Sequence, residues 1–524
     1  MKYFNTTGTC WPNRHYMLPA AERLVGAREY ITYGEYFVIH APRQSGKSTS
    51  LLQLASQLTA EGEVAALYIS CEVAEPLGDD YTAVENLLLD VLRREAAHSL
   101  PDDAQPPHEW PAAEAGSALL WALRAWVETC RRPLVLFLDE IDSIQGESLR
   151  SVLRQLRAGY NTARDRFVHS IALCGLRDVR DYKVASGGEE PRLGSASPFN
   201  IKVESIRLGD FTYDEVAALY GQHTAATGQE FSTRAIDLAY YYTKGQPWLT
   251  NALASEVIRR MKIAGTITDD HIDEAKERLI LARATHLDSL VYKLTDTRVR
   301  QVLEPLLAGT ELDVDDIYDD SVSYVRDLGL IAPGKTIRIA NPIYNEVIVR
   351  VLTATLEHNI FVEPSAFRLP DGRLDLHKLL TEFIAFWKEN GEIMLIKKGY
   401  HEAAVQLVVM AYLQRVVNGG GYIGREYGLG YKRVDLLVRQ PYTDADGRRA
   451  WQREAIELKV RRDGEPDPLD DGLIQLDSYL DRLDLDHGTL AIFDRRSCAA
   501  PLAERTGYTD TTSPAGRKIL LIRG

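Results

Sequence analysis

The chain has 524 residues, of which 45% are hydrophobic, 26% charged and 9% aromatic, and its formal net charge at pH 7 is −14. This length predicts roughly three domains, and the composition excludes collagen-like, mucin-like and wholly disordered chains. Taken as an average, the acidic balance argues against a basic protein that coats nucleic acid.

The apolar runs, the N-terminal residues and the cysteine spacing indicate where the protein is located. No apolar run approaches the roughly 18 residues of a membrane-spanning helix, and the first residues lack the layout of a secretion signal. The five cysteines are widely spaced and form no CxxC pair, which disfavours a zinc site or a disulfide framework. We therefore expect a cytoplasmic protein without a membrane partner.

Residues 1–205 alternate between strand and helix patterns. Continuous apolar runs separated by helices are typical of a parallel sheet with both faces covered, and four such runs occur, at residues 36–40, 65–70, 134–138 and 170–174. Residues 72–115 carry 11 acidic and 2 basic residues, and this imbalance predicts a solvated insertion within the domain, with a face that repels nucleic acid as the alternative.

A loop with phosphate-binding character follows the first strand and opens a helix. It consists of Ala41, Pro42, Arg43, Gln44, Ser45, Gly46, Lys47, Ser48 and Thr49. The pattern fits a P-loop except that Ala41 stands where a first glycine is usual. In such a loop, backbone N–H groups and the helix N-terminus face the phosphate oxygens. We expect Lys47 to neutralise the β and γ phosphates of ATP and the Ser48 hydroxyl to bind Mg²⁺.

The strand at 134–138 is followed by two carboxylates, Asp139 and Glu140. This is the layout of a Walker B motif, in which Asp139 would hold Mg²⁺ through water and Glu140 would orient the attacking water. The alternative is a plain helix cap, because Asp142 and Ser143 follow.

Four further positions are candidates for sensing or completing the nucleotide site. Arg177 follows the strand at 170–174 and would sense the γ-phosphate, with a surface ion pair as the alternative. Pro247, in the turn after Gly245, would approach the nucleotide from a helical lid, or the turn simply joins two helices. Arg154 and Arg157 would act as a finger in a neighbouring subunit, or are solvated.

The segments APRQSGKST, LVLFLDEID, CGLRDVRDYK and GQPW together resemble AAA-like P-loop ATPases of the archaeal-ATPase and signal-transduction (STAND) group. The resemblance covers roughly residues 1–290 and implies an ATPase core at 1–205, a helical lid at 206–290, and slow ATP hydrolysis used as a switch. Residues 291–357, with a predicted two-strand hairpin at 330–339, are similar to the winged helix often appended to such ATPases. This unit is not basic, which favours packing over DNA binding.

After a linker-like stretch at 358–375, residues 376–524 predict a separate α/β domain. Strand alternation places Asp435 on one strand where it can meet Glu457 and Lys459 on the next. Two carboxylates and a lysine suit phosphodiester hydrolysis assisted by Mg²⁺. A surface ion pair is the alternative for Glu457 and Lys459, and Glu454 is the alternative carboxylate, although its spacing from Glu457 directs it elsewhere.

Asp435, Glu457 and Lys459 resemble the PD-(D/E)xK nuclease superfamily, with Val434 in place of the proline of its name. The resemblance implies a restriction-endonuclease-like fold, catalytic roles for these three residues, and metal binding by Asp435 and Glu457. It also implies a further metal-binding carboxylate on a preceding helix and two nuclease-site residues on a following helix, which are Glu402, Gln475 and Tyr479.

We therefore predict an α/β protein in which an ATPase that binds ATP and Mg²⁺ controls a Mg²⁺-dependent nuclease, with DNA as the favoured substrate. Similar fusions suggest a role in anti-phage defence or mobile elements. One alternative is a switch whose C-terminal domain binds nucleic acid or protein without cleaving, and another is a ring-forming motor, which requires a homo-oligomer. Residues 391–524 hold 20 basic and 20 acidic residues, so the negative charge lies outside the nuclease-like region.

Overall fold

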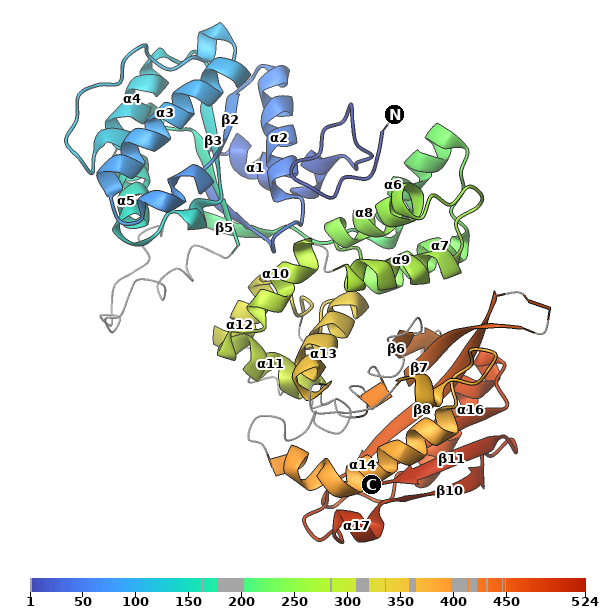
Figure 1. The fold of residues 1–524 in the computed structure, drawn as a ribbon. Helices are drawn as coiled ribbons and strands as arrows, with labels where there is room; N and C mark the ends of the chain where they lie inside the picture. The colour runs from blue at the N-terminus through green and yellow to red at the C-terminus, as the bar shows by residue number, and fades with distance from the viewer. Residues whose placement is uncertain are drawn as a thin grey trace. The chain divides into compact units, whose positions relative to one another are not determined.

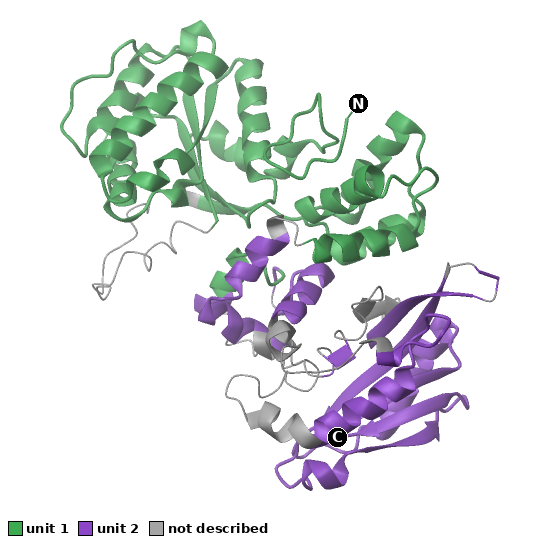
Figure 2. Cartoon of the chain, in the orientation of Figure 1, with its two compact units in different colours: residues 1–282, 323–332 green, residues 283–322, 333–524 purple. Residues whose placement is uncertain are grey.

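The structure is a computed structural model that describes residues 2–162, 164–176, 202–282, 285–307, 320–334, 336–357, 364–396, 409, 412–413, 422–429, 432–444, 446–447 and 449–524. The chain forms two compact units (Figure 2). The first comprises residues 1–282 and 323–332, and the second comprises residues 283–322 and 333–524. The chain therefore leaves the first unit and later returns to it.

A five-stranded parallel sheet forms the centre of the first unit, with the strand order β2-β3-β4-β1-β5. Its strands are β1 (Tyr36–His40), β2 (Ala65–Ser70), β3 (Leu134–Asp139), β4 (Ser170–Gly175) and β5 (Lys202–Arg207). The four predicted strands and their parallel arrangement are confirmed. The fifth, β5, lies at the sheet edge and has a mixed polar sequence, so it carries no continuous apolar signal.

Helices cover both faces of this sheet (Figure 1). Helices α3 (Tyr81–Ser99), α4 (Ala118–Thr129) and α5 (Gly146–Thr162) pack on one face. Helices α1 (Ala27–Thr32) and α2 (Lys47–Glu61) pack on the other. Alternate residues of β1 enter the two cores, Val38 the first and Phe37 the second, as the period of two in a strand requires.

The predicted solvated insertion at 72–115 is wrong. Helix α3 occupies much of this segment, and its Val84, Leu88 and Leu92 are buried in the core against the sheet. Leu100 and Ala104, beyond the helix, are buried in the same core. The acidic residues mostly lie on the outer side, so a net charge summed over the segment conceals an apolar stripe with helical spacing.

Four helices of the first unit follow the sheet, in the stretch where the sequence predicts a helical lid. They are α6 (Tyr213–Thr227), α7 (Thr233–Thr243), α8 (Pro247–Ser255) and α9 (Asp269–Leu281). Side chains satisfy the first backbone N–H groups of three of them. Thr212 and Glu215 form a capping box at α6, Ser232 caps α7, and the Gln246 side chain accepts from Leu249 N at α8. We call this group of helices the lid.

The next helices are α10 (Thr285–Lys293), α11 (Thr297–Leu307), α12 (Asp320–Asp327) and α13 (Pro342–Glu357). The predicted hairpin at 330–339 does not form two strands within the described residues, where only Ile331 and Ile339 are single bridge positions. Leu330, Ile331 and Ala332 are buried in succession, so they pack as an irregular segment instead of alternating between core and solvent.

The second unit contains a six-stranded mixed sheet with the order β10-β11-β9-β8-β7-β6. Its strands are β6 (Tyr422–Leu429), β7 (Lys432–Thr443), β8 (Arg449–Arg461), β9 (His487–Asp494), β10 (Gly507–Thr512) and β11 (Lys518–Arg523). Strand β8 pairs antiparallel with β7 and parallel with β9. The predicted separate α/β domain is therefore present, and β8 lies in the interior of its sheet.

Two main helices cover this second sheet. Helix α16 (Leu469–Leu483) packs through Leu476 and Leu480 on Leu437 of β7 and Ala455 of β8. Helix α14 (Leu376–Ile396) contributes Trp387, whose ring lies 5.4 Å from that of Phe493 in β9. The short helix α17 (Leu502–Arg505) precedes β10.

The expected linker at 358–375 is partly structured. Residues 358–363 lie outside the described residues, but Leu374 exchanges two hydrogen bonds with the side chain of Gln452 in β8, at 2.7 and 2.9 Å. The backbone of Asp371 also accepts from Thr443 N at 3.1 Å. Residues 364–375 thus pack on the second unit. Within the described part of the chain, no helix combines the length and apolar content of a membrane span.

Candidate functional site

The loop between β1 and α2 has the geometry of a phosphate-binding loop. Gln44 and Gly46 have positive φ values of 60° and 90°, which turn the chain tightly before the helix begins at Lys47. The Lys47 ammonium donates to the backbone oxygens of Ala41 at 2.6 Å and Pro42 at 3.1 Å. The lysine therefore folds back over its own loop.

The predicted metal-binding pair of the first unit lies together. The Ser48 hydroxyl donates to Asp139 Oδ2 at 2.6 Å, and the Tyr68 hydroxyl donates to the same oxygen at 2.9 Å. Asp139 is fully buried at the end of β3, and its other oxygen accepts from Glu140 N at 3.0 Å. A hydroxyl beside a buried carboxylate is an oxygen donor set that fits Mg²⁺. Tyr68 was not predicted, since a tyrosine in a buried strand gives no separate signal.

Glu140 has features of a reactive carboxylate. Its φ is 52°, an uncommon value outside glycine that costs free energy and is enriched at functional sites. Burial, followed by the neighbouring charges of Glu72 and Asp139, raises the pKa of Glu140 to about 7. Such a carboxylate can hold or release a proton near neutral pH.

The other residues predicted for the nucleotide site differ in where the structure places them. Arg177 lies outside the described residues. Pro247 is the buried first residue of α8, and the preceding Gln246 donates through Nε2 to the backbone oxygen of Gln44 at 3.4 Å. The predicted turn of the lid thus reaches the P-loop. Arg154 is exposed on α5, and Arg157 is half-buried.

Two contacts at the P-loop were not predicted. Arg23 donates to the backbone oxygen of Ser45 at 3.1 Å. Gly329, with φ of 76°, lies so near Pro42 that an added Cβ would approach the proline ring to 2.6 Å. No motif connects Arg23 or Gly329 with the loop in the sequence, because both contacts arise from tertiary packing.

The second unit brings five predicted nuclease-site residues together, on β7, β8 and α16. The pairing of Leu436 with Ile456 sets Asp435 opposite Glu457, and Asp435 Oδ2 accepts from Leu458 N at 2.8 Å. Lys459 Nζ lies 2.9 Å from Glu457 Oε1.

Two side chains of α16 continue this cluster. Lys459 Nζ donates to Gln475 Oε1 at 2.7 Å, and Gln475 Nε2 donates to the Tyr479 hydroxyl oxygen at 2.7 Å. Gln475 and Tyr479 therefore lie behind the lysine and restrict its position. Glu402, the further predicted carboxylate, lies outside the described residues.

The electrostatics of Glu457 are unusual. The residue is fully buried, and burial together with the charge of Asp435 raises the pKa of Glu457 to about 7, while Lys459 opposes the shift. A buried carboxylate facing a second one is a suitable partial ligand set for a divalent cation.

Glu454 lies elsewhere, as its spacing predicts. Its carboxylate accepts from Gln452 Nε2 at 2.8 Å and lies 3.0 Å from His487 Nε2. This contact with Glu454 raises the pKa of His487. Within the described parts of the chain, no group of three or more His, Cys, Asp or Glu side chains is arranged to hold a metal ion, so Asp435 and Glu457 form a two-carboxylate set there.

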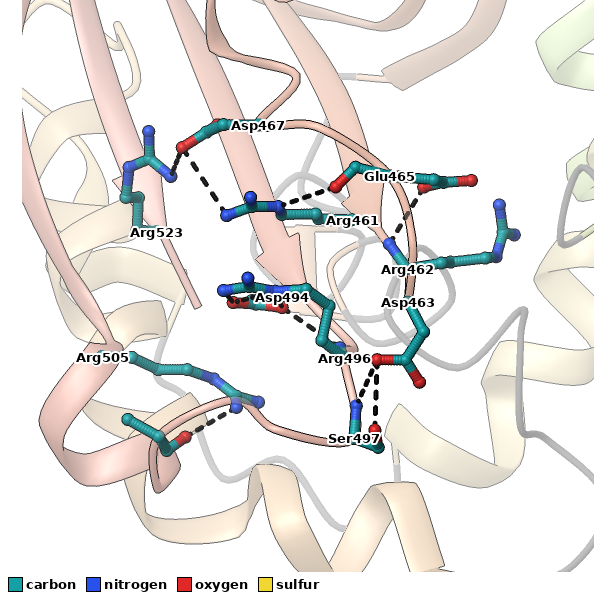
Figure 3. A network of polar contacts seen from close by, with 11 residues as sticks. Arg461, Arg462, Asp463, Glu465, Asp467, Asp494, Arg496, Ser497, Arg505 and Arg523 are labelled. Atoms are coloured by element: carbon teal, nitrogen blue, oxygen red, sulfur yellow. Dashed lines mark hydrogen bonds and ion pairs between the residues drawn. The ribbon is translucent and has the colours of Figure 1, made fainter.

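Three arginines beyond Lys459, namely Arg461, Arg496 and Arg523, are paired with carboxylates (Figure 3). Asp467 lies 2.9 Å from Arg523 and 4.0 Å from Arg461. Arg496 forms a two-pronged contact with Asp494 and lowers the pKa of that carboxyl to about 2. The two contacts of Asp467 connect the segment between β8 and α16 to β8 and β11, and the contact of Arg496 is local to the end of β9.

One protein family is similar to a part of the first unit. Residues 32–182 match the AAA domain family, and no curated protein matches. This match supports an AAA-like P-loop ATPase in the first unit.

Three solved structures are also similar to parts of this chain. A Walker-type ATPase of Pyrococcus abyssi is 13% identical, with coverage of 66% of this chain and 99% of that one and a TM-score of 0.46. The RuvB Holliday junction branch migration motor of Thermotoga maritima is 13% identical, with coverage of 62% and 92% and a TM-score of 0.33. Cdc6p of Pyrobaculum aerophilum is 12% identical, with coverage of 64% and 93% and a TM-score of 0.33.

Proposed function

We propose that this protein is an ATP-driven switch that controls a Mg²⁺-dependent nuclease acting on nucleic acid, with DNA as the favoured substrate. The observation that carries the nuclease proposal is the convergence of Asp435, Glu457 and Lys459 on adjacent strands. A surface ion pair would not require a fully buried glutamate, whereas a cation-binding site benefits from one.

In the ATPase unit, we assign a role to each residue around the P-loop. Lys47 binds the β and γ phosphates of ATP, and the backbone N–H groups of the loop surround them. Ser48 and Asp139 hold Mg²⁺, which when bound neutralises phosphate charge. Glu140 orients the attacking water and accepts its proton, and its raised pKa suits this role.

In the second unit, Asp435 and Glu457 hold Mg²⁺, and Glu402 is a further proposed ligand. The bound cation supplies charge neutralisation at the scissile phosphate and a more acidic water. Lys459 places its ammonium where negative charge develops during hydrolysis. Gln475 and Tyr479 keep that ammonium in position through the hydrogen bonds behind it.

The contact between Pro42 and Gly329 supports a link between the two activities. Gly329 belongs to residues 323–332, which pack on the first unit although the chain on either side belongs to the second. A change in the P-loop on binding ATP would therefore act on a segment continuous with the second unit. We propose that ATP and Mg²⁺ shift the lid and the predicted winged helix, and that this shift exposes or assembles the nuclease face.

One experiment tests the proposed function directly. The purified protein is incubated with plasmid, linear and single-stranded DNA and with RNA, with Mg²⁺ or Mn²⁺, with and without ATP. We expect metal-dependent cleavage of DNA that falls on the order of 10²-fold or more in Lys459→Ala and Asp435→Ala. Arg453→Ala is the matched control because Arg453 is an exposed basic residue on the same strand.

The outcomes distinguish the alternatives. Cleavage that survives in both Lys459→Ala and Asp435→Ala would refute the assigned site. Binding of DNA or of a protein without any metal-dependent product would favour a non-cleaving switch.

Only the assembly prediction is given a test of its own. The cytoplasmic location and a role in anti-phage defence or mobile elements stay predictions. A strict monomer with and without ATP would exclude the ring-forming motor and with it a trans role for Arg154 or Arg157.

A further inference from the structure

Arg23 bridges the P-loop and the lid from a third element. It ends a short 3-10 helix (Ala20–Arg23), and its guanidinium donates through Nη1 to the backbone oxygen of Ser45 at 3.1 Å. Through Nη2 it donates to the backbone oxygen of Gly209 at 2.5 Å. The guanidinium also lies over the ring of Phe211, 4.6 Å from its centroid. One side chain therefore contacts the loop and the segment that leads into the lid.

The contact with the loop is made through a backbone oxygen. In a P-loop the N–H groups point inward at phosphate oxygens, and a backbone oxygen of the loop can accept from a side chain that does not contact the phosphates. Arg23 binds the backbone oxygen of Ser45 in this way. A Cβ added to Gly46 would lie 3.0 Å from Arg23 Nη1, so the guanidinium also packs directly against the residue before Lys47. Arg23 thus contacts the loop at two consecutive residues, Ser45 and Gly46.

A second side chain makes a parallel connection. Gln246 donates through Nε2 to the backbone oxygen of Gln44 at 3.4 Å, and its Oε1 accepts from Leu249 N to cap helix α8. The two connections meet where the lid begins, because Phe211 N donates to the backbone oxygen of Gly245 at 2.8 Å. We call this place, residues 209–211 and 245–249, the seam. Two consecutive P-loop oxygens are therefore held by side chains that also hold the lid.

We infer that Arg23 is a positioning residue that couples nucleotide binding at the P-loop to the lid, with Gln246 as a second connection. This inference rests on the proposed ATP site. Phosphates that order the loop also fix its backbone oxygens at Gln44 and Ser45, and Arg23 transmits that order to residues 209–211 while Gln246 transmits it to the start of α8. By linkage, the ordered lid in turn strengthens nucleotide binding.

The test compares Arg23→Gln with Arg28→Gln. Arg28 is a matched control because it forms a surface ion pair with Glu61 at 2.9 Å, on helices α1 and α2. ATP affinity is measured by calorimetry, and amide hydrogen exchange is followed with and without Mg²⁺ and ATP. In the wild type, we expect ATP to slow exchange in the P-loop (residues 41–49) and at the seam (residues 209–211 and 245–249).

For Arg23→Gln we expect a roughly tenfold weaker ATP affinity, equivalent to about 1.4 kcal/mol. Protection of the P-loop by ATP persists, and protection of the seam is lost. Arg23→Lys should fold and show the same loss, because a single ammonium cannot reproduce the two-pronged guanidinium contact. Arg28→Gln should retain the wild-type pattern at both places.

Three results would overturn the inference. The first is seam protection at the wild-type level in Arg23→Lys or Arg23→Gln. The second is loss of P-loop protection together with seam protection in both variants, which would show that Arg23 builds the loop and does not couple it. The third is a wild-type protein that binds ATP without any protection at the seam. A wild-type protein that binds no ATP would refute the ATP site itself, a result recognisable before any variant is made.

Discussion

Glu140 and Glu72 form a pair of carboxylates beside the proposed nucleotide site. Burial and the charge of Glu72 are the first two causes that raise the pKa of Glu140 to about 7. A water-activating base must be ionised, so hydrolysis should rise as the pH increases through about 7. Removing a neighbouring negative charge stabilises the ionised form and lowers the pKa.

The Glu72→Gln variant should therefore shift the acidic limb of the pH–rate profile to lower pH. The measurement is kcat for ATP hydrolysis between pH 5 and pH 9. Glu75→Gln is the matched control, because Glu75 is an exposed glutamate in the same short helix and is not among the causes of the Glu140 shift. An unchanged limb in Glu72→Gln, or an equal shift in both variants, would contradict the assignment of Glu140 as the base.

Glu140 is also the residue whose replacement should separate binding from hydrolysis. Glu140→Gln keeps the shape of the side chain but removes the proton acceptor, so kcat should fall on the order of 10²- to 10⁴-fold while ATP affinity changes little. Lys47→Ala should instead weaken ATP binding itself, because the phosphate charge loses its ammonium partner. Nucleotide-binding titrations beside steady-state hydrolysis distinguish the two variants. Equal loss of binding in both would contradict the separate roles.

Residue patterns with a fixed local spacing could be predicted from the sequence, and isolated tertiary contacts could not. The P-loop and Asp139 follow strands directly, so Ser48 and Asp139 were expected to meet, and their side chains lie 2.6 Å apart. Likewise, strand alternation placed Glu457 with Lys459 and away from Glu454. Arg23 acts across 22 residues of sequence on a backbone oxygen, a contact that no composition or period reveals.

At the level of elements, the turn that opens helix α8 depends on Gly245. Its φ is 79°, and an added Cβ would lie 1.7 Å from the backbone oxygen of Phe211. Gly228, at the end of α6, has a similar φ of 75° but no atom within 4 Å of such a Cβ. The two positions therefore share the same backbone requirement and differ only in steric contact.

We expect Gly228→Ala to reduce the free energy of unfolding by about 1 kcal/mol, the usual cost of a left-handed alanine. Gly245→Ala should reduce the free energy of unfolding by about 3 kcal/mol or more, because the added Cβ clashes with the Phe211 backbone and the segments at residues 209–211 and 245–249 must separate. Urea unfolding followed by the fluorescence of Trp248, a buried residue of α8, measures both. Equal reductions in the free energy of unfolding for the two variants would show that the backbone around Gly245 and Phe211 can shift to accommodate the added Cβ at little cost.

Strands and helices could be predicted where a single sequence signal, such as a continuous apolar run, marked them. Strands β1 to β4 are continuous apolar runs and were located correctly, whereas β5 is polar at the sheet edge and was missed. Helix α3 was hidden by the acidic residues on its outer side. The predicted hairpin at 330–339 failed because its apolar residues are buried in succession, a packing choice that the local sequence does not specify.

At the scale of the whole molecule, the two units have separate hydrophobic cores. A ligand that binds only the folded form of one unit stabilises that unit by mass action. ATP at 100 times its dissociation constant should therefore stabilise the first unit by about 2.7 kcal/mol and move its calorimetric transition to higher temperature. The transition of the second unit should move much less.

The Lys47→Ala variant supplies the control for this calorimetric experiment, since its transitions should not respond to ATP at the same concentration. An equal upward shift of both transitions in the wild type would show that the two units unfold as one, contrary to their separate cores.

The return of residues 323–332 to the first unit has a consequence for protein synthesis. A ribosome makes about 5–20 residues per second, so all of β1 to β5 and the lid emerge before the turn at Gly329 that contacts Pro42. Residues 283–322 must be synthesised before residues 323–332, which complete the first unit, can pack on it. During that interval the P-loop of the nascent chain is still missing one of its neighbours.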